Sequence, residues 1–318
     1  MPLIFAMNGC AAIQVKLGMK VYLAKIPVNS IEVRQAKDPG IGPGQKSSLI
    51  VEVTKPVGKV LQTEGAGKGK VMWRDLVVTP TIVTVNNKGV LTLAKDPRKS
   101  DGKFPTVTIT APSHPDLHAQ LDVPLRYNYK FVSNFSGTPG FDGMNGSDGT
   151  TGSSGSMGST DPNNPSAGGD GGNGGPGGDG GPGGNGGDAP SVQVQVTLRT
   201  GSHPLLQAGV FAPGHKRYYL VDPQGGTLTV KADGGKGGSG GKGGNGGQGG
   251  SGGSGSPSGN NGSSGTSGIN GPDGSPGRGG LITVTYDPKV KPYLANLIFS
   301  SWNGPKPVLE EAPVVPLW

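Results

Sequence analysis

Histidine is the first residue type to examine for chemistry in this chain, because imidazole can bind a metal ion or transfer a proton. His114 and His118 are four residues apart, a spacing that places two metal ligands on one face of a helix. Pro115 lies between them and the surrounding pattern is that of strands, so we expect a loop without a metal site. The tripeptide Ser-His-Pro occurs at 113–115 and again at 202–204, but adjacent serine and histidine do not make a catalytic triad.

Oxygen ligands recur at Asp142, Asn145 and Asp148, and such oxygens suit calcium. Their period is three, without the nonapeptide frame of a calcium-binding β-roll, so we interpret them as solvated side chains. A glycine-rich phosphate loop is excluded, because no glycine tract joins a strand to a helix and the Lys-Ser/Thr pair is missing. The sequence therefore predicts no catalytic residue, no metal site and no cofactor, and a protein that is not an enzyme.

The single cysteine, Cys10, follows a short apolar stretch and a small residue. Residues 3–12 resemble the lipobox of bacterial lipoproteins, which implies a lipid on Cys10 and a place on a bacterial membrane or cell surface. The stretch lacks a charged n-region, which leaves open a true start upstream of Met1. A buried free cysteine that packs as a small hydrophobic residue is the alternative.

Glycine with a period of three dominates the sequence, which has 63 glycines in 318 residues. Gly-X-Y triplets run through 137–160 and Gly-Gly-X triplets, seven of them, through 168–188. The order then reverses, with seven Gly-Gly-X triplets in 234–254 and Gly-X-Y again in 259–278. Period-three glycine is typical of a polyproline-II-type helix, which has three residues per turn and one edge without side chains.

Three structures fit such repeats. A three-chain collagen helix would favour proline in the other positions, and prolines are few here. A flexible Gly/Ser linker needs no fixed frame, yet these tracts keep theirs for seven or eight triplets. We favour a polyglycine-II bundle within one chain, because a Gly-Gly-X helix has two glycine edges and can pack between neighbours. The Gly-X-Y tracts would then be the outer helices, with turns at 161–167 and 255–258 forming the tip of a shaft.

The bundle makes specific expectations for the inner helices. Their glycines should face neighbouring backbones, and the expected packing positions are Gly171, Gly172, Gly174, Gly175, Gly240, Gly241, Gly243 and Gly244. The X residues are acidic in one inner tract and basic in the other, as adjacent antiparallel helices would prefer. The alternative is that these charges only solvate the shaft.

Net charge and hydropathy limit the partners. The formal charge is +7, but the basic residues are dispersed and lack the aromatic interleaving of a nucleic-acid binder, so we expect no nucleic acid. Mild basicity weakly favours an anionic polysaccharide or a lipid surface. No apolar run is long enough to cross a membrane as a helix, which leaves the lipid on Cys10 as the expected membrane contact.

Before the first folded unit, apolar and other residues alternate. This pattern predicts a long amphipathic strand whose apolar row is Ile13, Val15, Leu17, Met19, Val21 and Leu23. An unpaired strand of this kind is prone to association. We expect it either to add to a neighbouring subunit's sheet or to close the sheet of its own domain.

Residues 27–131 show short strands between turns, which predicts a β-sandwich. The expected strands are Ser30–Val33, Ser48–Val53, Lys70–Arg74, Ile82–Val85, Gly89–Ala94, Thr106–Ala111 and Leu121–Leu125. Trp73 and the Val-Asn-Asn-Lys-Gly-Val run at 85–90 are the most specific parts of a resemblance to the bacterial immunoglobulin-like domain of group 2. That resemblance implies a sandwich module of surface and adhesion proteins, without catalytic residues.

A second β unit, 132–304, carries the glycine tracts. Strands are expected near 192–198, 281–286 and 294–299, and a hairpin is expected from 218–221 to 227–230 across Asp-Pro-Gln-Gly-Gly. The tail, Pro305–Trp318, should be extended because of its prolines, and should wrap its own domain or dock on a neighbour.

The sequence therefore predicts an all-β protein with almost no α-helix: an immunoglobulin-like sandwich and a second β unit with a polyglycine-II bundle. We expect a bacterial cell-surface or extracellular structural protein that assembles through strands into a homo-oligomer, filament or layer. The alternative is an adhesin that binds glycan or another surface at the shaft tip, and ice binding through Ser/Thr rows is a third, weaker option.

Overall fold

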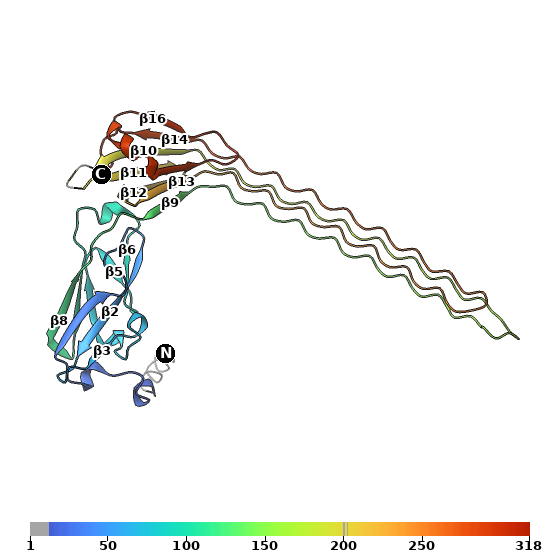
Figure 1. Cartoon of the computed structure of the whole chain (residues 1–318), viewed down its shortest axis with the longest axis horizontal. Helices are drawn as coiled ribbons and strands as arrows, with labels where there is room; N and C mark the ends of the chain where they lie inside the picture. The colour runs from blue at the N-terminus through green and yellow to red at the C-terminus, as the bar shows by residue number, and fades with distance from the viewer. Residues whose placement is uncertain (1–12, 200, 202) are drawn as a thin grey trace.

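A computed structural model describes residues 13–199, 201 and 203–318 of the chain. Two β-sheet units lie one after the other, and four extended segments project together from the second unit as a long shaft (Figure 1). Strands dominate both units, and the helical elements are short. The expected all-β class is confirmed.

The first unit contains two antiparallel sheets. One has the order β1-β2-β6-β5 with β3 on β2, and the other is β4-β7-β8. The strand bounds are β1 Ser30–Gln35, β2 Lys46–Thr54, β3 Val60–Gln62, β4 Val77–Pro80, β5 Val83–Val85, β6 Val90–Leu93, β7 Thr106–Ala111 and β8 His114–Asp122. Alternation decides which side is buried: in β7 every second residue, Val107, Ile109 and Ala111, is buried in a core shared by both sheets.

Trp73 lies in this core, and a tight turn is built against it. The Asn86 side chain accepts hydrogen bonds from the backbone N–H groups of Lys88 and Val90, at 3.0 and 2.9 Å. Gly89 has a φ of +70°, and a Cβ there would overlap the Trp73 ring. Only glycine fits both the left-handed backbone and the close ring.

The expected amphipathic strand from Ile13 to Leu23 is wrong. Residues 13–16 form a helical turn, and the Leu17 N–H donates to the Ile13 carbonyl at 3.0 Å. Gly18 then adopts a φ of +69°, which ends any extended run. Val21 forms a single bridge to Val71. Of the apolar row, Ile13, Leu17 and Met19 are exposed, whereas Leu23 is fully buried in the first unit's core.

Other elements of the first unit also differ from expectation. Lys70–Arg74 is not a strand, because after the bridge at Val71 the chain turns into the 3-10 helix η3 (Trp73–Asp75). The segment around His114 and His118 lies in β8 rather than in a loop. The remaining 3-10 helices are η1 Leu23–Lys25, η2 Gly65–Gly67, η4 Pro97–Lys99 and η5 Pro288–Asn296.

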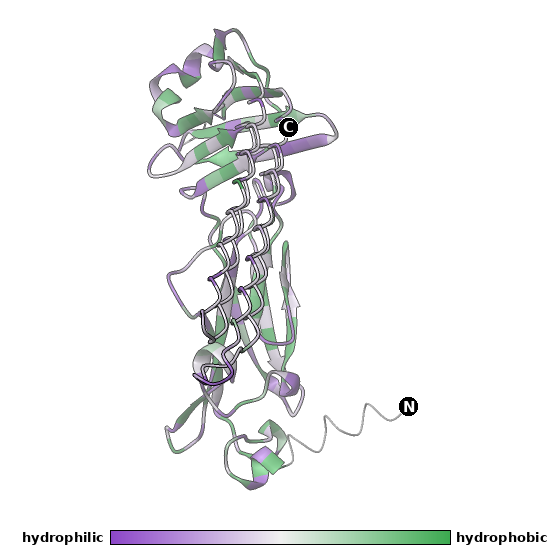
Figure 2. Cartoon of the chain, turned by 90° about the vertical axis from the view of Figure 1, so that its right-hand side faces the viewer, coloured by the Kyte–Doolittle hydropathy of each residue, from purple (hydrophilic) through white to green (hydrophobic). Residues whose placement is uncertain are grey.

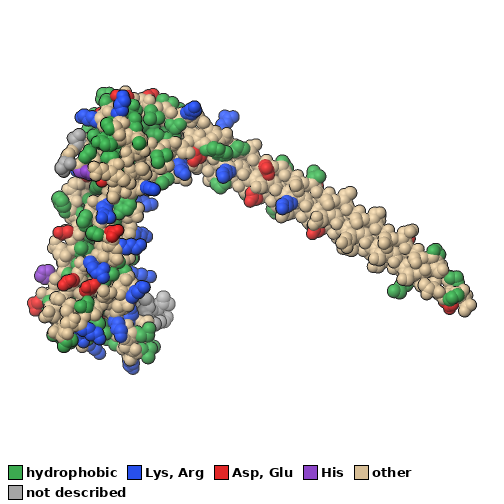
Figure 3. Space-filling model, viewed as in Figure 1, with side chains coloured by type: hydrophobic (Ala, Val, Ile, Leu, Met, Phe, Trp, Pro, Cys, Tyr) green, Lys and Arg blue, Asp and Glu red, His purple; other side chains and the backbone are tan. Residues whose placement is uncertain are grey.

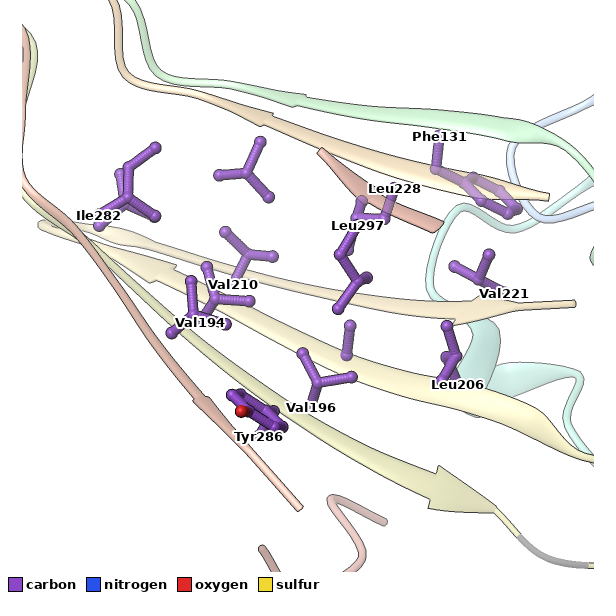
Figure 4. Packing of buried hydrophobic residues seen from close by; sticks show 14 of the residues in the cluster. Phe131, Val194, Val196, Leu206, Val210, Val221, Leu228, Ile282, Tyr286 and Leu297 are labelled. Atoms are coloured by element: carbon purple, nitrogen blue, oxygen red, sulfur yellow. The ribbon is translucent and has the colours of Figure 1, made fainter. Parts of the chain in front are cut away.

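The second unit has a five-stranded sheet, β12-β11-β10-β14-β16, and a parallel three-stranded sheet, β15-β13-β9. The bounds are β9 Lys130–Asn134, β10 Val192–Arg199, β11 Leu205–Ala212, β12 His215–Val221, β13 Thr227–Lys231, β14 Ile282–Tyr286, β15 Leu297–Ser300 and β16 Val308–Glu311. Side chains from both sheets, among them Phe131, Leu228 and Val194, meet in one core (Figure 4).

The expected hairpin between β12 and β13 is wrong, because these strands belong to different sheets: β12 pairs with β11, and β13 with β9 and β15. The loop between them therefore carries the chain from one layer to the other. Strand β11 escaped prediction because its first six residues are all buried, so its sequence does not alternate.

The tail wraps its own unit, as the first alternative held. Its β16 pairs in parallel with β14, which agrees with the expected extended conformation. Beyond it, Gln207 of β11 accepts the Leu317 N–H at 3.1 Å, and Thr197 donates to the Val314 carbonyl at 3.0 Å. The tail thus covers the face of the large sheet opposite the core.

Candidate functional site: the glycine-rich shaft

The shaft consists of segment 1 (137–160), segment 2 (168–188), segment 3 (234–254) and segment 4 (259–278), each continuous with a strand. Segment 1 follows β9 and segment 3 follows β13, while segment 2 leads into β10 and segment 4 into β14. Each of the two sheets of the second unit is therefore continuous with two of the four segments. With the shaft pointing toward the viewer, the four segments wind side by side, and few of their residues are coloured as hydrophobic (Figure 2).

The register of the sheets continues unchanged into the shaft. Lys130 of β9 pairs with Thr227 of β13, 97 residues later, and in the shaft Asp142 accepts the Ser239 N–H across the same separation of 97. Strands β10 and β14 pair at a separation of 90, which recurs where Asp170 accepts the Asn260 N–H. The buried faces of the sheets fix their register, so they also set the alignment of the segments.

Backbone hydrogen bonds join neighbouring segments at every third residue. Glycine N–H groups of segment 1 donate to segment 3, from Gly140 to the Lys236 carbonyl onward, at 2.6–2.8 Å. Segment 2 donates to both outer segments, while segments 3 and 4 donate to segments 2 and 3 respectively. Segments 2 and 3 each bond to all the others, and between the described residues of segments 1 and 4 there is no hydrogen bond. The Gly-Gly-X segments are thus the inner ones, and they run antiparallel.

The expected packing glycines face neighbouring backbones or side chains. A Cβ added at Gly171, Gly174, Gly240, Gly241, Gly243 or Gly244 would fall 1.9–2.2 Å from a carbonyl oxygen of another segment. At Gly172 and Gly175 it would meet the side-chain oxygens of Ser153 and Thr150, at 2.8 and 2.7 Å. Real Cβ atoms do not approach a carbonyl oxygen so closely, so the first six positions require glycine. At Gly172 and Gly175 the hydroxyl groups can rotate away, so the requirement there is weaker.

Asp and Asn side chains complete the bonding, which corrects their interpretation as merely solvated. Segment 2 side chains accept N–H groups of segment 4 at 2.6–2.8 Å, and these acceptors are Asp170, Asn173, Asp179, Asn185 and Asp188. Asp142, Asn145 and Asp148 accept segment 3 N–H groups at 2.8–2.9 Å. This role could have been predicted from the sequence, because Asp and Asn recur at the third position of the triplets.

Charge pairing between the inner segments is not what joins them. Among the described residues no ion pair links the aspartates of segment 2 to Lys236 or Lys242, both of which are exposed. The aspartates instead serve as hydrogen-bond acceptors on the side of segment 4. Lysine has no acceptor atom and cannot take that role.

Asp233 ties the shaft to its base. Its carboxylate accepts the Ser300 hydroxyl and, at 2.7 Å, the Trp302 N–H, while its carbonyl accepts the Gly137 N–H at 2.9 Å. Burial by itself would raise the pKa of Asp233, but these hydrogen bonds outweigh it and lower the pKa below its usual value. The ionised carboxylate therefore belongs to the native junction.

At the far end, two short turns close the shaft and bond to each other. The Gly168 N–H donates to Pro257 at 3.0 Å, and the Ser256 N–H donates to Ser166 at 2.9 Å. Residues 161–167 are all exposed. Asn163 and Asn164 use only their backbone N–H groups within the turn, so their amide side chains face solvent.

The two β units meet in a small polar contact. Arg98 of η4 lies over the Tyr218 ring at 3.8 Å, and Asp101 accepts hydrogen bonds from Arg199 and, at 2.9 Å, from Trp318 Nε1. Burial raises the pKa of the nearby Tyr127 to about 12. These contacts hold the first unit against the end of the second that bears β12.

The residues examined for chemistry are not assembled into a reactive site. The His114 ring contacts the Ser113 hydroxyl at 3.0 Å and the Ile26 carbonyl at 3.2 Å, and His203 lies 2.9 Å from Asp222. Within the described residues, no cluster of three His, Cys, Asp or Glu could hold a metal, and no helix is long and apolar enough to cross a membrane. Cys10 and Ser202 lie outside the described residues.

Fold and shaft together define a mostly β-sheet protein with a projecting glycine-rich element. Comparisons with protein-family models, with curated proteins and with solved structures found no match.

Proposed function

We propose that this chain is a non-catalytic module of a bacterial surface or extracellular structure, and that its shaft holds an exposed tip away from the two β units. The observation that carries the proposal is the continuity of each shaft segment with a buried strand, in unchanged register. A shaft rooted in this way resists bending at its base. A flexible linker would need neither the register nor the bonds between segments.

We infer that the four segments are polyglycine-II helices and that the first unit is an immunoglobulin-like sandwich. The first inference is supported by the glycine contacts and by hydrogen bonds with a period of three. At about 3.1 Å per residue, a segment of 21 residues is roughly 65 Å long. The second is supported by two antiparallel sheets that share a core around Trp73, and by the Gly89 turn.

The tip is the contact surface in this proposal, as in an adhesin that binds glycan. Its turns expose asparagine and serine side chains, which suit hydrogen bonds to sugar hydroxyls. The test uses Asn163→Ala/Asn164→Ala against the mid-shaft control Ser154→Ala/Gln248→Ala on an array of bacterial surface polysaccharides. Loss of binding in the tip variant alone supports the proposal. Equal binding by both variants, or no glycan binding by the intact chain, overturns it.

Assembly through strands is the second candidate function. It is favoured by β16, which forms the edge of the five-stranded sheet and whose four residues are all exposed, including Val308 and Leu309. Residues 13–23 do not support assembly, because they do not form the expected strand. Sedimentation of the intact chain and of Leu309→Lys tests it: concentration-dependent oligomers that the charge abolishes favour assembly, and a monomer at high concentration rejects it.

We propose further that a lipid on Cys10 holds the module at the bacterial surface, on the basis of the lipobox-like stretch at 3–12. Expression of the chain in bacteria with labelled palmitate tests this. Label that disappears in Cys10→Ser supports the anchor, and an unlabelled protein rejects it.

A further inference from the structure

A groove of about 520 Å³ lies where the two β units meet. The first unit contributes the turn before β2 with Gln45, and the segment after β6 with Lys95. The second unit contributes β9 with Lys130, and β12 with Lys216 and Arg217. The groove therefore exists only because the two units are joined at this angle.

Positive charge dominates the lining. Lys95, Lys130, Lys216 and Arg217 all line the groove, and the three lysines are exposed. In the described part of the chain, none of these four is in an ion pair. Figure 3 shows further lysine and arginine side chains on the side of the first unit that faces the shaft.

The one carboxylate of the lining does not neutralise these cations. Asp96 is held by Arg98 through hydrogen bonds of 2.7–3.1 Å, and Arg98 in turn lies over Tyr218. The Arg217 guanidinium lies over the Phe135 ring at 4.5 Å and donates to the Asn134 carbonyl, so the exposed cations of the groove are the three lysines. Together the lysines focus a positive potential in the groove. A bound anion would relieve the repulsion among them, so the arrangement is one that an anionic ligand stabilises.

The aromatic residues narrow the class of ligand. One face of Tyr218 is covered by Arg98, and the Trp318 ring packs edge-on at 5.8 Å, so this ring is not free to stack on a nucleobase. The exposed side-chain amide of Gln45 supplies hydrogen-bonding groups instead. Charge together with hydrogen-bonding groups suits a sugar chain that bears acidic groups.

We propose that this groove binds an acidic oligosaccharide, recognised by its carboxylate or sulfate groups. The site is separate from the shaft tip and goes beyond the display function. The probes are a heparin-derived oligosaccharide, which is sulfated, and an oligogalacturonate, which is carboxylated, with neutral dextran as the blank.

Lys95→Gln/Lys216→Gln removes one cation from each unit, and Lys37→Gln/Lys59→Gln removes two exposed cations outside the groove. Calorimetry at two salt concentrations should show binding roughly tenfold weaker and less salt-dependent in the first variant, as expected for two lost ion pairs. The control should stay within about twofold, and the tip variant Asn163→Ala/Asn164→Ala should bind normally. Thermal melts check folding, and Lys216→Gln alone serves if the double variant does not fold.

Several results would overturn the proposal. Equal losses in groove and control variants would indicate attraction by net charge alone. Single-stranded DNA of equal charge that binds the groove as tightly as the sugar chains would show that the ligand class is wrong. Binding of dextran, or of none of the probes, would remove the site.

Discussion

Two adjacent glycines of segment 2 offer a sharp test of how the shaft packs. A Cβ at Gly180 would lie 2.0 Å from the Gly241 carbonyl oxygen, whereas a Cβ at Gly181 would meet Met144 backbone atoms at 3.4–3.5 Å, an ordinary contact. The substitutions Gly180→Ala and Gly181→Ala are the same change in composition. They differ only in whether the methyl group enters the contact with segment 3.

The geometry sets the size of the effect. To accommodate the added methyl group of Gly180→Ala, segments 2 and 3 must separate locally by about 1.4 Å, which lengthens the bond from the Gly241 N–H to Gly181, now 2.8 Å, beyond useful range. The bond from the Gly180 N–H to Ile269, now 2.9 Å, is strained as well. One bond lost and one weakened, at about 1 kcal/mol per bond, give a destabilisation of roughly 1–2 kcal/mol. Gly181→Ala should be neutral, or stabilising by about 0.5 kcal/mol, because alanine restricts the unfolded chain.

Hydrogen exchange of shaft amides, followed by mass spectrometry of peptides, measures this directly. Gly180→Ala should accelerate exchange in segments 2, 3 and 4 near the substitution, while Gly181→Ala should match the parent chain. Similar exchange in the two variants would refute the packing argument. Rapid exchange of all shaft amides in the parent protein would show that the segments behave as linkers.

Four other contacts give predictions of their own. Asn173→Ala should destabilise the shaft by about 1 kcal/mol, because the N–H of Ser263 loses its acceptor; Asn245→Ala, where no side-chain bond is made, should be silent, and equal effects on shaft hydrogen exchange would contradict this. Leu23→Ala should cost about 2–5 kcal/mol in urea unfolding of the first unit, because Leu23 is fully buried. It should leave the sedimentation coefficient unchanged. Dissociation of an oligomer in this variant would instead support the hypothesis that the segment from Ile13 to Leu23 joins subunits. The pKa of Asp233 is lowered in the folded chain, so its contribution to stability is present above the ordinary value near 3.8 and is lost as pH falls below it; Asp233→Asn should flatten thermal stability between about pH 4 and 2, and an unaltered profile would argue against the junction. Trp318→Phe keeps an aromatic ring but removes the 2.9 Å bond to Asp101, so small-angle scattering should show a wider range of angles between the units, and an identical scattering curve would exclude the tail as a clamp.

The sequence by itself determined the shaft almost completely. The period of three, the doubling of glycine in 168–188 and 234–254, and the proline- and serine-rich breaks specify which segments lie inside and where the chain turns. They do so because a glycine edge is needed wherever another backbone approaches, and this requirement is local and repeated. Alternation likewise predicted β7, β10 and β14, each of which has one buried and one more exposed face.

Tertiary structure decided the features that a local pattern does not encode. The row from Ile13 to Leu23 alternates like a strand, but it does not form one. Gly18 has a positive φ that interrupts an extended chain, and Leu23 is buried in the core. Strand β11 is buried on both faces by the core and by the tail, so its alternation is lost. The register of the shaft comes from pairing between strands 90 and 97 residues apart. Long-range contacts of this kind depend on which sheets face each other, and only the folded chain specifies that.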